Sequence, residues 1–156
     1  MNLEISIEYE PWNAVGVDAI ARDCVKTIFT ELRFVQNNVE ICFLFTSDEE
    51  MRLLNKTYLG VNKSTNVLSF PTNLPISLDF NDGPPGILGS LAFGHQTILQ
   101  ESLEQQKSFE NHLKHLVVHG MLHLFGHDHG KMQDAEKMES LEKAILAQLN
   151  VPDPYQ

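Results

Sequence analysis

Cationic residues are scarce in this sequence. Its 156 residues include 11 Lys and Arg against 21 Asp and Glu, which gives a formal net charge of −10. Proteins that coat nucleic acid by bulk charge depend on Lys and Arg to neutralise phosphates. The composition therefore excludes that class of protein, although it leaves room for a local basic patch.

Cysteine and long apolar stretches are also scarce. The two cysteines, Cys24 and Cys42, lack C-x-x-C spacing, so we expect small buried thiols with no disulfide or metal role. The longest apolar run, residues 41–45, is far shorter than the ~18 residues that a membrane span needs. Residues 1–4 lack the basic and apolar parts of a secretion signal. We expect a cytoplasmic protein with no membrane partner.

The remaining composition is that of a folded globular protein, with 42% hydrophobic and 21% charged residues. Alternating or short apolar runs predict strands, and apolar residues at 3.6-residue spacing predict helices. The expected fold is α+β, one domain over residues 1–156, with a single mixed β-sheet of about four strands packed against a layer of helices. The predicted strands are residues 3–9, 39–45, 66–71 and 87–93; the predicted helices are 14–33, 47–57 and three pieces from 95 onward; 72–86 is a long loop.

Histidine is concentrated in one segment, because six of the seven histidines lie between residues 112 and 129. His119 and His123 are four residues apart, so on a helix both imidazoles project from one face and can reach one ion. Gly126 can end that helix in the left-handed conformation, which lets the chain reverse and bring His129 back as a third ligand. Three imidazoles leave a fourth tetrahedral position for water, as in a catalytic zinc site.

The same spacing, H-x-x-x-H-x-x-G-x-x-H, occurs in the metzincin zinc peptidases. Those enzymes carry a Glu general base directly after the first His, and this chain has Gly120 there. The helix is therefore zinc-peptidase-like in its two His ligands, but it lacks the carboxylate that peptide hydrolysis requires.

Four segments together resemble a bacterial family. Residues 119–129 (HGMLHLFGHDH) resemble the H-G-x-L-H-L-x-G-[YF]-D-H signature of the YbeY endoribonucleases, and residues 58–71 resemble that family's Y-R-x-x-x-x-P-T-[ND]-V-L-S-F-P block. Residues 138–142 and 153–155 are similar to its closing helix and tail. The resemblance implies one zinc ion held by His119, His123 and His129, and a role in maturing the 3′ end of 16S ribosomal RNA and in late ribosome quality control. Its implied partners are ribosomal RNA, ribosomal particles and other ribosome-assembly proteins.

The chain departs from the family pattern at several positions. Leu59 replaces the Arg of the family, Ser90 replaces an Asp, Ser64 replaces a Pro and His127 replaces an aromatic residue. Lys63 is the nearest candidate to replace the lost positive charge. Two alternatives stay open. Leu59 and Ser90 favour a zinc-stabilised ribosome-assembly factor with weakened or lost nuclease activity, and the acidic composition favours a metal hydrolase acting on a small substrate.

The predicted mechanism is zinc-assisted cleavage of single-stranded RNA. We expect His115, one turn before His119, to act as the acid/base group and Lys63 to stabilise the anionic transition state. Asn66 and Ser69 can bind a phosphate or a ribose hydroxyl, although capping of a strand end is an equal alternative. The nucleophile, water or the ribose 2′-hydroxyl, stays open.

A stripe of cations on the first helix is the clearest basic surface. Arg22, Lys26 and Arg33 fall on its outer side by helical geometry. They are either an ordinary solvated face or a surface for RNA and ribosome contact.

Overall fold

The computed structural model describes residues 2–34, 39–72, 86–127 and 132–155. Its sheet has the strand order β1-β2-β4-β3, in which β1 pairs parallel with β2, β2 pairs parallel with β4, and β3 pairs antiparallel with β4. The expected mixed four-strand sheet is therefore confirmed, and β3 lies at one edge of it. The strands are β1 (Asn2–Ile7), β2 (Val39–Thr46), β3 (Val67–Pro71) and β4 (Gly86–Gly94).

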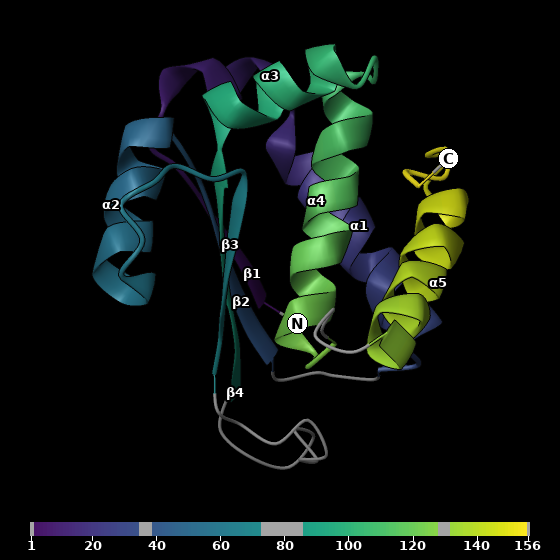
Figure 1. The fold of residues 1–156 in the computed structure, drawn as a ribbon. Coiled ribbons are helices and arrows are strands. Elements are labelled where there is room, and N and C mark those ends of the chain that lie inside the picture. The colour runs from purple at the N-terminus through teal and green to yellow at the C-terminus, as the bar shows by residue number, and fades with distance from the viewer. Residues whose placement is uncertain (1, 35–38, 73–85, 128–131, 156) are drawn as a thin grey trace.

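Helices cover both faces of this sheet. Figure 1 shows α1, α4 and α5 on one side, α2 on the other, and α3 across one end. The three helical pieces expected after residue 95 are α3, α4 and α5, while α2 covers the face opposite the expected helical layer. The helices are a 3-10 helix η1 (Glu10–Ala14), α1 (Val17–Glu31), α2 (Asp48–Leu59), α3 (His95–Glu104), α4 (Phe109–Leu124) and α5 (Met132–Gln148).

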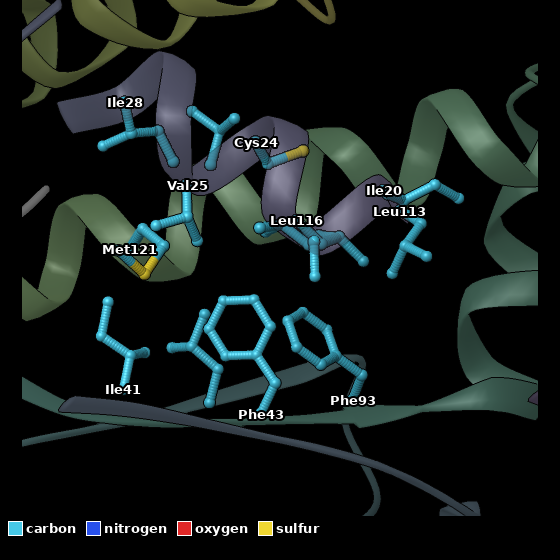
Figure 2. Close-up of a cluster of buried hydrophobic side chains, with 14 of the residues drawn as sticks. Ile20, Cys24, Val25, Ile28, Ile41, Phe43, Phe93, Leu113, Leu116 and Met121 are labelled. Carbon is cyan, nitrogen blue, oxygen red and sulfur yellow. The ribbon is translucent and has the colours of Figure 1, made fainter. Parts of the chain in front are cut away.

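The main core lies between the sheet and the pair α1 and α4. Strand β2 alternates, so that Val39, Ile41 and Phe43 point to one face and are buried. Figure 2 shows side chains of α1 and α4 pointing toward Ile41, Phe43 and Phe93 of the sheet. Because α4 is packed on this side, its position relative to the sheet is set by the largest apolar cluster of the molecule.

Two helix boundaries differ from the expected ones. Gly16 adopts a left-handed φ of 76°, which separates η1 from α1 in place of one continuous helix from residue 14. At the other end α1 stops at Glu31, and Arg33 has a φ of 53° in the turn that follows. Arg33 is thus off the helix, and the basic stripe is shorter than expected. The predicted cap of α2 is present, since the hydroxyl of Ser47 accepts from the backbone N–H of Glu50 at 3.3 Å.

The two cysteines differ in burial. Cys24 is fully buried, and burial raises the pKa of its thiol to about 12. Cys42 is only partly buried, because it alternates onto the other face of β2, where its thiol donates to Glu4. Among the described residues, no helix is both long and apolar enough to span a bilayer. Of the expected loop at 72–86, residues 73–85 lie outside the described part of the chain.

Candidate metal centre

Helix α4 carries four histidines in a row along one face. Successive ring centroids lie 6.2 Å apart from His112 to His115, 6.2 Å from His115 to His119, and 4.6 Å from His119 to His123. The sequence spacing of three, four and four residues produces this row, because side chains three or four apart share a helix face. The row borders a groove of about 970 Å³, which has β3 along it and residues of α3 and the C-terminal segment at its side. That volume falls in the range of ligand-binding clefts.

The closest pair in the row is His119 and His123. Their Nε2 atoms are 3.1 Å apart, and both side chains line the groove. Two imidazole nitrogens that each bind one tetrahedral ion at about 2.0–2.1 Å lie about 3.3–3.4 Å from one another. The observed separation therefore fits two ligands of a single ion. The third predicted ligand, His129, lies outside the described residues, so the complete set stays a prediction.

The helix ends where the predicted chain reversal requires. Gly126 follows the last turn of α4 with a φ of 89°, and the amide of His127 bonds back to the carbonyl of Leu122 at 3.0 Å. This is the left-handed glycine stop that the sequence predicts.

A buried carboxylate stands behind the row. Glu142 of α5 is 0% exposed, and its Oε1 lies 2.8 Å from Nδ1 of His119. Its Oε2 lies 3.1 Å from Nε2 of His115 and accepts from the hydroxyl of Tyr155 at 2.6 Å. Burial by itself would raise the pKa of Glu142, but the hydrogen bonds from His115, His119 and Tyr155 hold it well below its usual range. Glu142 is therefore a carboxylate anion.

These contacts define a second group of possible metal ligands. One ligand atom each from His115, His119 and Glu142 lie within 4.8 Å of one another, so this part of the chain could hold a metal. However, both Glu142 oxygens already accept hydrogen bonds inside the fold, and an ion there would displace them. The Nε2 atoms of His119 and His123 border the open groove, which is the better position for an ion that must reach a substrate.

The other end of the row is organised around Glu101 of α3. Its Oε1 lies 3.0 Å from Nε2 of His112 and accepts from Nδ2 of Asn66 at 3.0 Å. His112 is 3% exposed, and burial lowers its pKa below the ordinary value. This contact set joins α3, α4 and the start of β3.

Three of the groove residues are predicted to bind substrate or act as the acid/base group, and all three already have partners inside the fold. The amide of Asn66 contacts Glu101, and its Oδ1 accepts from the backbone of Val67. The hydroxyl of Ser69 donates to the carbonyl of Gly120 at 3.2 Å. His115 meets Glu142 through Nε2, while its Nδ1 is buried. Their substrate-binding and acid/base roles therefore stay predictions, and the capping alternative describes the Asn66 contact.

The predicted cations lie elsewhere. Lys63, Arg22, Lys26 and Arg33 are not among the described residues that line the groove, and Arg22 pairs with Asp18 at 2.9 Å. Lys107, after α3, is a described cation that does line it. Sequence reasoning missed Lys107 because it lies outside every motif.

Sequence reasoning also missed Glu142 and Tyr155. Glu142 falls at helical spacing between Met138 and Ile145, both of which are fully buried. A carboxylate within such an apolar stripe is a signal that it has partners inside the fold. Tyr155 carries no comparable signal, because it follows the last helix.

Gly120, which stands in place of the peptidase base, packs against the sheet. A Cβ at this position would lie 3.0 Å from Leu91 Cδ2 and 3.3 Å from Ser69 Oγ. A side chain at residue 120 would therefore press on Leu91 of β4 and Ser69 of β3, where the space is already filled. The geometry agrees with the sequence argument against a peptidase.

Comparison with known proteins agrees with the resemblance noted in the sequence. The family model described as endoribonuclease YbeY matches residues 4–150. The chain belongs to the endoribonuclease YbeY family. It is 40% identical over 153 residues to an endoribonuclease YbeY of Nitrobacter winogradskyi. That alignment covers 97% of this chain and 80% of the relative. It is 48% identical over 153 residues to one of Rhodopseudomonas palustris (strain BisB18), covering 97% and 90%.

A solved structure shares the fold. The solution structure of the Thermotoga maritima protein TM1509 superposes with a TM-score of 0.59 at 20% sequence identity, covering 95% of this chain and 91% of that one. Membership of the YbeY family confirms the expected enzyme class, an endoribonuclease and hence a hydrolase that acts on RNA.

Proposed function

We propose that this chain is a zinc-dependent endoribonuclease that cuts single-stranded RNA in the maturation of the 3′ end of 16S ribosomal RNA and in late ribosome quality control. It would act in the cytoplasm as one domain over residues 1–156. The observation that carries the proposal is the 3.1 Å approach of the His119 and His123 Nε2 atoms beside an open groove. The family match supplies the class of reaction.

His119, His123 and His129 are the proposed zinc ligands. When bound, zinc supplies Lewis acidity, which lowers the pKa of a water toward ~7 and polarises a phosphoryl oxygen. Glu142 contacts Nδ1 of His119. The other ring nitrogen of His119, Nε2, is therefore directed at His123. Lys107 is the described cation best placed to attract an RNA phosphate into the groove, which is the role that the sequence predicts for Lys63.

The charge of the chain limits how RNA can bind. At −10 overall, with Glu101 beside the groove, the protein should hold free RNA weakly and lose it steeply as salt rises. We therefore propose that ribosomal particles, with other assembly proteins, present the substrate strand to the groove. Arg22 and Lys26 lie on a different surface, and they would serve particle contact and not the cut itself.

A second function is favoured by one feature. Leu59 at the end of α2 is 60% exposed, where the family carries an Arg. Without that cation, the chain could be a zinc-stabilised ribosome-assembly factor that binds particles and does not cut.

The deciding experiment is cleavage of a ribosomal RNA fragment by purified protein, its His123→Ala variant and a Glu110→Ala control. Glu110 is an exposed residue of the same helix and pairs with Lys114 at 3.4 Å. We expect cleavage by the wild type and the control, and none by His123→Ala. Equal cleavage by all three would contradict the proposal, and particle binding without cleavage would favour the assembly factor. Elemental analysis of protein purified without a nickel column identifies the ion.

A further inference from the structure

Glu142 is a charged side chain in a place where charges are rarely found. It is 0% exposed, and α5 is fixed around it by the buried side chains Met138, Ile145 and Leu146. A buried carboxylate is stable only where donors satisfy its oxygens. Here the donors come from two elements, the histidines of α4 and Tyr155 of the C-terminal segment.

The contact with His119 determines which ring nitrogen is available. Because Oε1 of Glu142 is 2.8 Å from Nδ1, the carboxylate requires the hydrogen on Nδ1. The lone pair of the neutral ring is then on Nε2, the atom that lies 3.1 Å from His123 Nε2. A carboxylate that receives the other N–H of a metal-binding histidine fixes its tautomer and raises its basicity.

The C-terminal segment completes the arrangement. Tyr155 donates to Oε2 of Glu142 at 2.6 Å, and its ring meets the edge of His115 with centroids 5.8 Å apart. The segment is held in turn by the backbone of Tyr155, which donates to Asp153 at 2.8 Å, and by buried Val151. Tyr155 also lines the groove.

We infer that Glu142 is a positioning residue that sets the tautomer and orientation of His119 for metal binding, and that Tyr155 holds Glu142 in place, so that the C-terminal segment is part of the centre. This rests on the proposed metal at His119 and His123. Glu142 acts through His119 and does not itself bind the ion.

The test measures zinc affinity by competition with a chelator, using Glu142→Gln, Tyr155→Phe and a Glu136→Gln control. Glu136 is exposed on the same helix, so the control removes the same charge from the surface. We expect zinc affinity to fall about 10–100-fold in Glu142→Gln and less than about tenfold in Tyr155→Phe, with one ion per chain retained. The control should be unchanged.

A second readout separates positioning from a general loss of folding. In metal-free wild type, nitrogen NMR should show His119 protonated at Nδ1, and in Glu142→Gln a mixture of both tautomers. Urea unfolding of the metal-free variants checks that they are folded under the assay conditions. Unchanged affinity and tautomer in Glu142→Gln would overturn the inference while leaving zinc binding by the wild type intact. Loss of the stoichiometric ion would also overturn it, because Glu142 would then be a ligand. If the proposed function fails, the result differs from both of these outcomes, because the wild-type protein itself would bind no zinc.

Discussion

Two carboxylates contact the α4 histidine row in different surroundings, Glu142 at the middle two rings and Glu101 at the His112 end. Glu142 is 0% exposed and contacts His115, His119 and Tyr155, whereas the side chain of Glu101 is 29% exposed and contacts His112 and Asn66. In the first case two rings of the row share one fully buried anion. In the second case one ring and an amide share a carboxylate that water still reaches. Histidines that are alike in spacing therefore differ in the partners that other segments of the chain bring to them.

The largest expected difference between the two ends is in metal binding. His123→Ala should lower zinc affinity by more than about 100-fold, because it removes a proposed ligand and not an outer contact. His112→Ala should leave it within about twofold, since His112 binds Glu101 at the far end. Chelator competition measures both, and comparable losses would contradict the distinction between the ends.

The stability of the metal-free fold should also differ. Glu142→Ala leaves two imidazoles and a tyrosine hydroxyl without their shared acceptor, and we expect the free energy of unfolding to fall by about 3–5 kcal/mol. Glu101→Ala should cost about 1 kcal/mol, since its oxygens are partly solvated. Urea unfolding measures the free energy of unfolding of both variants. Equal losses would mean that the burial of Glu142 does not increase its contribution to stability.

A substitution at Gly120 tests the face of α4 that packs on the sheet. Gly120→Glu should lower the free energy of unfolding by about 2–3 kcal/mol, because the new side chain would meet Leu91 and Ser69. It should give no peptidase activity, since the space beside residue 120 is already filled by Leu91 and Ser69. A stable variant that hydrolyses peptides would show that this face had been assigned wrongly.

The smallest effect is the pH dependence of the far end. Burial lowers the pKa of His112, so the unfolded chain binds a proton there at higher pH than the folded chain does. This contribution to stability is present above the unfolded pKa of about 6.5 and is lost as the pH falls toward the lower folded pKa. The drop in unfolding free energy between pH 7 and pH 5 should therefore be smaller in His112→Gln. A drop as large as in the wild type would contradict the lowered pKa.

Local sequence signals predict much of the fold and, in the metal centre, the pair His119 and His123. The period of α1, the Ser47 cap and the Gly126 stop depend on neighbouring residues, and each appears as expected. The pairing of His119 and His123 also follows from one helical turn.

The remaining features depend on contacts between distant elements. Glu142 and His119 are 23 residues apart in the sequence, and Glu101 and Asn66 are 35 apart. No local sequence pattern predicts contacts at such separations. Lys63 lies within the family-like segment at residues 58–71, whereas Lys107 lines the groove because α3 ends beside it. Spacing predicts which side chains share a helix face, and tertiary packing decides which carboxylate each one meets.

The most direct test is a crystal structure of the zinc-loaded protein with anomalous data at the zinc edge. We predict one ion on the groove side, bound by Nε2 of His119, Nε2 of His123 and a ring nitrogen of His129, with Glu142 still on Nδ1 of His119. An ion bound by His115, Nδ1 of His119 and Glu142 would contradict it.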